Sequence, residues 1–250
     1  MDATAQPEYL LTKSTFVCLT DGALVFLDLH NDRYSCLESR HTGPVARLLG
    51  LPPLTATDPE NAGRLRDTPC EEDVARMVQD LIDRGLVTQD PDAGKRAEFI
   101  AQNGELRELL GYEIGEAPKI RAGHVLAFFK AVIVTKSMLR FASMERIVTR
   151  VKRRKERHLA RGGSEPDAER INELVEIYKI LKPLFVTVKD NCLFNSLFLI
   201  EFLAQYGVCP TWYFGVRLNE FYAHCWVQGG NVIYDDFIDT TSLNQPIMAV

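Results

Sequence analysis

The chain has 250 residues and 46% hydrophobic content, enough for one or two domains that each bury a core. Its formal net charge of −5 gives no overall electrostatic case for binding nucleic acid or an anionic membrane. The N-terminus lacks the basic and apolar parts of a secretory signal, and charges interrupt every apolar stretch before about 20 residues. The six cysteines form no Cys-x-x-Cys pair and are too sparse for a disulfide scaffold. These features predict a cytoplasmic protein without a zinc site.

The first part of the chain predicts a small unit of strands and helices. Three short β-rich runs, over residues 15–20, 22–29 and 33–38, are separated by an Asp-Gly turn and a His-Asn-Asp turn. A short helix is expected over Gly43–Leu49. A loop rich in Thr, Asp, Pro and Gly follows it.

A second helix of this unit has clear signals at both ends, and Leu86 lies beyond its C-terminal end. Thr68 can cap it, Pro69 suits the first helical position, and Glu71 completes a capping box. Gly85 fits the position just beyond its C-terminal cap. One apolar stripe at helical spacing consists of Val74, Met77, Val78, Leu81 and Ile82.

The middle of the chain predicts a linker followed by helices. Residues 91–119 are weakly patterned and read as the linker. A long helical region is expected over 120–160, ended by Gly162-Gly163, and a further helix over Asp167–Leu181, ended near Pro183. The basic run 150–161 is interpreted as a solvated helix face. Contact with an acidic peptide, a partner enzyme or nucleic acid is the alternative.

A buried helix and three strands are predicted after residue 190. Asp190 or Asn191 can cap a helix that starts at Cys192 and is apolar almost all round, which is typical of a buried helix. Gly207 ends it. Strands are expected over 211–217, 221–228 and 231–236, with a tight hairpin at the Gly-Gly pair between the last two.

Three residues of this region could act together as a nucleophilic site. Cys192 lies in the first turn of its helix, where the helix dipole and unpaired N–H groups favour a thiolate. His224, on the second strand, could act as base and then acid. A two-residue Gly-Gly loop would put His224 opposite Asp235, whereas a three-residue loop would put it opposite Asp236. Either carboxylate would orient the imidazole.

Structural roles compete with this interpretation. A cysteine at a helix start is more often a small buried residue, and a lone histidine on a strand is more often structural. The other cysteines, Cys225 among them, are interpreted as core or incidental. The order Cys192, His224 and then an aspartate on the next strand is rarer, and it predicts a cysteine-nucleophile hydrolase.

Four segments, DNCLFNSLFLIEFLAQYG, TWYFGV, FYAHCWVQ and NVIYDD, resemble the transglutaminase-like cysteine proteases of lasso-peptide biosynthesis, the B proteins. The shared motifs are Cys192-Leu193 followed by Ser196-Leu197, then Gly215-Val216, then Ala223-His224-Cys225-Trp226-Val227, and Asp236. The resemblance implies a papain/transglutaminase-like fold and Cys–His–Asp roles for Cys192, His224 and Asp236. Asp235 is the runner-up on loop geometry.

The N-terminal unit resembles a PqqD-like precursor-peptide recognition element, a small winged helix-turn-helix-like domain that is fused to some B proteins. The resemblance rests on element order and on phrases such as GALVFLDL and RYSCLE. It implies that a leader peptide binds as an added strand beside 33–38 and against the second helix. Tyr34, Ser35, Cys36 and Leu81 are the candidate contacts, although Tyr34 and Leu81 could simply be core.

The sequence thus predicts an α+β protein with leader recognition in residues 1–90, a linker over 91–119 and a cysteine protease domain over 120–250. The expected reaction is hydrolysis of the leader–core bond of a lasso precursor peptide. An ATP-dependent macrolactam synthetase is the expected partner, and no metal, organic cofactor, nucleic acid or membrane is expected. The Cys192 N–H is one expected oxyanion donor, with the Asn191 side chain a further candidate. Another acyl-transfer enzyme, such as a transglutaminase or amidase, and a catalytically dead binding scaffold are the alternatives.

Overall fold

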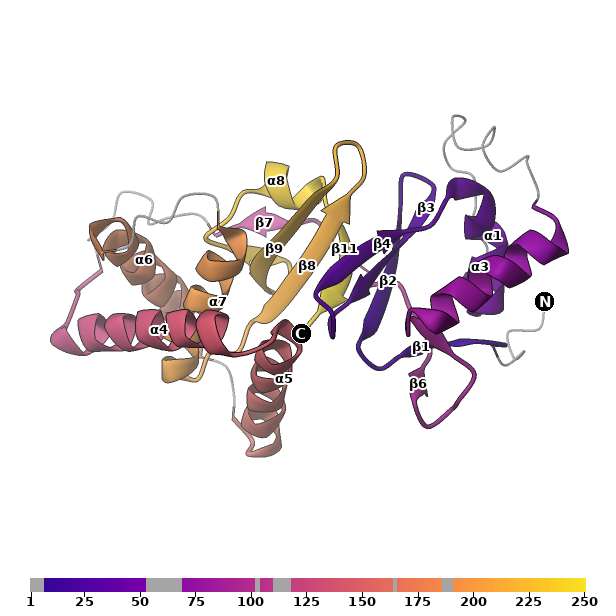
Figure 1. The fold of residues 1–250 in the computed structure, drawn as a ribbon. Helices are drawn as coiled ribbons and strands as arrows, with labels where there is room; N and C mark the ends of the chain where they lie inside the picture. Colours follow the sequence, from indigo (N-terminus) through magenta and orange to yellow (C-terminus); the bar gives the residue numbers. More distant parts are fainter. Residues whose placement is uncertain (1–6, 53–68, 102–103, 110–117, 164–165, 186–190) are drawn as a thin grey trace. The chain divides into compact units, whose positions relative to one another are not determined.

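The computed structural model forms two compact units. The first comprises Met1–Ala101 with Val216–Tyr222 and Gln245–Met248, and the second comprises the remainder. The structure describes residues 7–52, 69–101, 104–109, 118–163, 166–185 and 191–250 (Figure 1).

The N-terminal unit contains the three predicted strands as an antiparallel sheet in the order β2-β3-β4. These are β2 (Thr15–Thr20), β3 (Ala23–Asp28) and β4 (Arg33–Cys36). Thr20 pairs with Ala23, and both residues of the intervening Asp-Gly turn have positive φ angles, 49° and 73°. This backbone favours the twist of a hairpin. Every residue of β3 is buried, whereas β4 forms an edge of the sheet.

A second three-stranded sheet was not predicted. It has the order β5-β1-β6, with β1 (Leu10–Thr12) between β5 (Val87–Thr88) and β6 (Gly94–Lys95). A Cβ at Gly94 would lie only 2.6 Å from the Cβ of Leu10, so a larger residue would push these strands apart. Strands of two or three residues are too short for a periodic pattern, and β6 falls within the segment interpreted as linker.

Two helices are described in the N-terminal unit, α1 (Ser39–Leu48) and α3 (Glu71–Asp83). The prediction that the first begins at Gly43 was wrong, because α1 starts four residues earlier and tolerates Pro44 within it. The predicted capping box at the start of α3 was also wrong, because the N-cap is Cys70, without a side-chain hydrogen bond. Thr68 lies outside the described residues.

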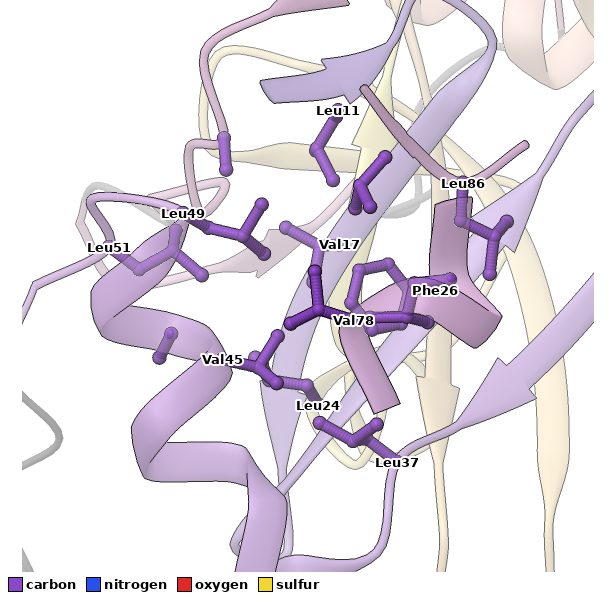
Figure 2. Packing of buried hydrophobic residues seen from close by; sticks show 14 residues of the cluster. Leu11, Val17, Leu24, Phe26, Leu37, Val45, Leu49, Leu51, Val78 and Leu86 are labelled. Atoms are coloured by element: carbon purple, nitrogen blue, oxygen red, sulfur yellow. The ribbon is translucent and has the colours of Figure 1, made fainter. Parts of the chain in front are cut away.

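The C-terminal end of α3 follows the predicted pattern. Gly85 has φ +69°, and the N–H of Leu86 donates to the carbonyl of Leu81 at 2.9 Å. This left-handed glycine satisfies the last carbonyls of the helix. The apolar stripe of α3 packs into the core of the unit with residues of both sheets and of α1, as Figure 2 shows for Phe26, Val78 and their neighbours.

The C-terminal sheet has five strands in the order β11-β8-β9-β10-β7. They are β8 (Thr211–Arg217), β9 (Tyr222–Gly229), β10 (Val232–Tyr234), β11 (Gln245–Ala249) and β7 (Arg107–Glu108). The first three confirm the predicted strands, with β10 shorter than expected. The edge strands β7 and β11 were not predicted, and β7 pairs in parallel with β10.

Five α-helices are described in this unit: α4 (Ala122–Phe141), α5 (Met144–Ala160), α6 (Ala168–Phe185), α7 (Cys192–Leu203) and the short α8 (Ile238–Ser242). Figure 1 shows α4, α6 and α7 gathered at one side of the sheet. The helices α4 and α7 pack against each other, as do α6 and α7. The chain is therefore a mixed α+β protein.

Two predicted helix boundaries in this unit differ from the structure. The single helical region expected over 120–160 is broken, because Ser143 caps a new helix and accepts a hydrogen bond from the N–H of Arg146 at 3.4 Å. Helix α6 extends past the expected end at Leu181 and stops at Phe185. The exposed Pro183 lies in its last turn, so the helix does end near the proline, as predicted.

Helix α7 is almost entirely buried, as predicted. Nine of its 12 residues are buried. The ring of Phe198 lies 4.9 Å from the rings of both Phe128 on α4 and Tyr178 on α6. The Tyr178 hydroxyl donates to the carbonyl oxygen of Asn195 at 3.1 Å. These contacts fix the position of α7 and of the residue at its start.

Among the described residues, α4 alone is long and apolar enough to cross a membrane by length and composition. About 28% of its most apolar window is buried. A helix in the core of a soluble protein meets the same criteria, so this single helix is weak evidence for a span.

Candidate active site

Cys192 is the first residue of α7, as predicted. The side-chain oxygen of Asn191 caps the helix by accepting a hydrogen bond from the N–H of Phe194 at 2.9 Å. This confirms Asn191 as the cap, and the alternative cap, Asp190, lies outside the described residues. The thiol therefore lies where the helix dipole favours negative charge.

His224 lies on β9 with 7% of its surface exposed. Its ring is nearly parallel to that of Trp226, at a centroid distance of 6.1 Å and an interplanar angle of 16°. A Cβ at Gly215, on the neighbouring β8, would lie 2.9 Å from the Trp226 ring. The Gly-Val motif of β8 thus leaves room for the tryptophan that flanks the histidine.

The hairpin between β9 and β10 has neither of the two predicted registers. Gly229 pairs with Val232, so the turn consists of Gly230 and Asn231. Extending this register would place His224 opposite Phe237, beyond both candidate aspartates. Strand pairing therefore does not bring a carboxylate to the histidine.

A change of backbone direction at the end of β10 brings a carboxylate to His224 instead. The strand ends at Tyr234, and Asp235 has φ +54°, a left-handed conformation that is uncommon for non-glycine residues. Its carboxylate accepts a hydrogen bond from Lys182 of α6 at 2.6 Å. Asp236 is thereby turned toward His224, and its Oδ2 lies 2.6 Å from Nε2. The structure thus brings Asp236, and not Asp235, to the histidine.

The surroundings of Cys192 strongly favour its thiolate. A hydrogen bond from the Cys225 side chain, which outweighs burial, lowers the pKa of Cys192 from 9.0 to about 4, together with His224 and the Cys225 N–H. Burial lowers the pKa of His224, but hydrogen bonds with Asp236 and Cys192 raise it to about 9. At neutral pH the pair is therefore a thiolate and an imidazolium, with Nδ1 the ring nitrogen available to the thiol.

Sequence reasoning missed the role of Cys225. It is buried, as expected, with 4% of its surface exposed, but it also hydrogen-bonds to Cys192. That hydrogen bond, together with burial, raises the pKa of the Cys225 thiol well above its ordinary value. Its place next to His224 in the sequence was the available signal.

The candidate oxyanion donors remain predictions. The side-chain oxygen of Asn191, Oδ1, is used in capping α7. The side-chain nitrogen of Asn191, Nδ2, is a donor, as is the backbone N–H of Cys192.

The candidate leader-binding residues lie in the N-terminal unit. Tyr34 and Ser35 are half-buried on β4, Cys36 is exposed at the end of that strand, and Leu81 of α3 lies in the core with 2% exposure. The Ser35 hydroxyl accepts a hydrogen bond from Arg84 at 2.7 Å. A pocket of about 180 Å³ beside them is lined by Asp28, Asn31, Arg33, Ser35, Arg84 and Leu86.

The basic run 150–161 lies on α5 and the residue after it. Arg154 forms an ion pair with the buried Glu201 of α7 at 2.7 Å, and Lys155 donates to the Thr211 hydroxyl at 2.8 Å. These two cations therefore hold α5 against α7 and β8. The other arginines and Lys152 are exposed, which agrees with a solvated helix face.

In the described ranges, no group of three or more His, Cys, Asp or Glu residues is placed to hold a metal ion. A family model described as the transglutaminase-like superfamily matches residues 131–248, a span that contains Cys192, His224 and Asp236. Searches among curated proteins and among solved structures gave no significant match. Residues 131–248 thus contain a transglutaminase-like core domain.

Proposed function

We propose that this chain is a cysteine peptidase that removes the leader from a lasso-peptide precursor before the macrolactam closes. The observation that carries the proposal is the Cys192–His224–Asp236 arrangement within a transglutaminase-like domain. This arrangement indicates a papain-like mechanism. The choice of a lasso precursor as the substrate rests on the sequence resemblance to B proteins.

The reaction needs only the groups of this site. The Cys192 thiolate attacks the scissile carbonyl carbon, and the oxygen takes the negative charge. The imidazolium of His224 gives its proton to the leaving amine as the C–N bond breaks, which leaves a thioester. His224 then takes a proton from water, the hydroxide attacks the thioester, and Cys192 leaves as a thiolate. Asp236 orients His224 and stabilises its charged form throughout.

The N-terminal unit would act as a PqqD-like, winged helix-turn-helix-like recognition element. Its edge strand β4 can accept an added peptide strand through main-chain hydrogen bonds. The pocket beside it, with Arg33 and Arg84, suits an acidic or polar side chain of the leader. Cys36 and Tyr34 would lie along the bound strand, while the buried Leu81 would support it from below.

Leader capture has a kinetic purpose. A bound leader makes cleavage effectively intramolecular, at an effective concentration on the order of 1 mM for a short linker. The cleavage site itself can then be recognised weakly. The proposal includes a cytoplasmic location and an ATP-dependent macrolactam synthetase as the enzyme that receives the released core.

A transglutaminase or amidase activity is the second candidate, because the matching family is described as transglutaminase-like. The two differ in what attacks the thioester, an amine or water. Incubation with an amine acceptor separates them. A covalent amine adduct of the peptide favours the transferase, and a free carboxylate favours the peptidase.

The test of the peptidase uses the full chain and a lasso precursor peptide as substrate, with mass spectrometry of the products. Wild type should release intact leader and core, Cys192→Ala should release neither, and the exposed Cys70→Ala should act as wild type. Iodoacetamide near neutral pH should label Cys192 before the other five cysteines. Equal labelling of all six, without cleavage, would favour the binding scaffold.

A further inference from the structure

Cys225 contacts the nucleophile from the strand that carries the catalytic histidine. Both its side chain and its backbone N–H form hydrogen bonds with Cys192. Its Sγ also lies 3.4 Å from the Oγ of Ser196, one turn along α7 from the nucleophile. The half-buried thiol of Cys192 therefore lies beside two buried groups, the Cys225 thiol and the Ser196 hydroxyl.

The direction of the hydrogen bonds among these groups follows from the fixed donors and acceptors around them. The indole N–H of Trp212 can only donate, and it donates to the Ser196 hydroxyl at 2.9 Å. The backbone carbonyl of Cys192 can only accept, so at 2.7 Å it takes the hydroxyl hydrogen of Ser196. Ser196 then has no hydrogen left for Cys225.

The thiol hydrogen of Cys225 consequently has two possible acceptors, the Ser196 oxygen and the Cys192 sulfur. The sulfur carries the negative charge in the active ion pair, and hydrogen bonds to a charged acceptor are roughly twice as strong as neutral ones. Burial of Cys225 also keeps its own thiol neutral, so the hydrogen stays available.

We propose that Cys225 is a positioning residue that donates its thiol hydrogen to the Cys192 thiolate and holds that sulfur beside His224. The proposal deepens the peptidase function and rests on it for its catalytic meaning. The Cys225 thiol, the Cys225 N–H and the His224 ring together give the sulfur three hydrogen-bond donors. The same donors stabilise Cys192 as the leaving group when water cleaves the thioester.

A stabilised thiolate is more abundant but less nucleophilic, so the two effects partly cancel near neutral pH. The specific signature of Cys225 is therefore not the rate at pH 7 but the pH at which Cys192 becomes reactive. The acid limb of the pH–rate profile is the part at low pH where the rate rises as the Cys192 thiol loses its proton. Loss of the donor should move this limb to higher pH, whereas loss of a residue that merely fills space would leave it in place.

The experiment measures the rate of Cys192 alkylation by iodoacetamide against pH in the full chain, with the site located by mass spectrometry. In Cys225→Ala and the larger Cys225→Val, the acid limb should rise by at least about one pH unit. In Cys225→Ser, which keeps a donor, it should stay near wild type. The buried Cys18→Ala, in the other unit, is the matched control. An unmoved limb in both the alanine and valine variants would overturn the proposal.

A second measurement needs no variant. The S–H stretching band of Cys225 should shift to higher frequency in the infrared difference spectrum when wild-type Cys192 is alkylated, because the charged acceptor is lost. A spectrum without that shift would also contradict the proposal. Neither measurement uses a peptide substrate, so a shifted limb without precursor cleavage would refute the peptidase function and leave the positioning role of Cys225 standing.

Discussion

The C-terminal unit holds Cys192, His224 and Asp236 by buried elements, whereas the N-terminal unit presents its candidate recognition residues along an edge strand. In the first case a buried helix, a buried strand and an ion pair hold His224 in hydrogen bonds with both Cys192 and Asp236. In the second, β4 is an edge strand of its sheet and has a small polar pocket beside it. The chemistry thus depends on fixed side chains and the proposed recognition on main-chain groups.

This contrast predicts different sensitivities to substitution. Single side chains of the C-terminal site should have large effects on kcat. Changes to the N-terminal edge, or to the leader that it binds, should act mainly on KM.

The largest effect is expected for Asp236→Asn. The amide keeps the size of the side chain but cannot stabilise the imidazolium, so kcat should fall by about 10³- to 10⁴-fold. The exposed Asp239→Asn on α8 is the matched control and should act as wild type. Steady-state hydrolysis of the precursor measures both. A loss of less than about tenfold in Asp236→Asn would remove Asp236 from the site.

A smaller effect, confined to binding, is expected when the leader is shortened. A precursor that keeps the cleavage site but lacks the segment bound by the N-terminal unit should show a KM raised by about 10²- to 10³-fold, with kcat nearly unchanged at saturation. Both substrates are compared on the same intact enzyme. Equal kcat/KM for the two would mean that the N-terminal unit does not capture the leader.

The ion pair between Lys182 and Asp235, just after β10, should have a smaller effect on kcat. Lys182→Met leaves the half-buried carboxylate of Asp235 without its ion-pair partner and should lower the free energy of unfolding by about 3 kcal/mol. Asp236 would also lose its fixed position, and kcat should fall by roughly 10- to 100-fold. Chemical denaturation and steady-state kinetics measure the two effects. The exposed Lys136→Met on α4 should change neither.

A double variant shows whether the ion pair matters for its charge or for the backbone. Asn tolerates the left-handed conformation of residue 235, so Lys182→Met with Asp235→Asn removes the unpaired charge without altering the turn. Recovery of stability and kcat together would show that the unpaired charge displaced Asp236. Recovery of stability alone would show that the Lys182 contact itself holds the turn.

The residues that could be predicted from the sequence are those set by local rules. The Cys192 helix start, its Asn191 cap and the buried character of α7 follow from capping and apolar pattern within a few residues. The strand that carries His224 follows from its β-rich run. The transglutaminase-like match supports the region chosen for the site.

The features that could not be predicted depend on partners distant in the sequence. The choice between Asp235 and Asp236 depends on Lys182, 53 residues away, and not on the hairpin loop. The bond from Cys225 to Cys192 likewise depends on how β9 packs against α7. The edge strand β7 has only two residues, and its partner β10 lies far along the chain.

The smallest change is expected in kcat/KM when the pH is varied near neutrality. This measurement tests the ion pair between Cys192 and His224. The thiolate is lost as the pH falls through about 4, and the proton needed by the leaving amine is lost as it rises through about 9. Between pH 6 and 8, kcat/KM should therefore vary by less than about twofold. In Asp236→Asn the basic limb should move down, because the hydrogen bond that raises the pKa of His224 is weakened. A wild-type basic limb near pH 6.5, unchanged by that substitution, would show that Asp236 does not hold the histidine proton.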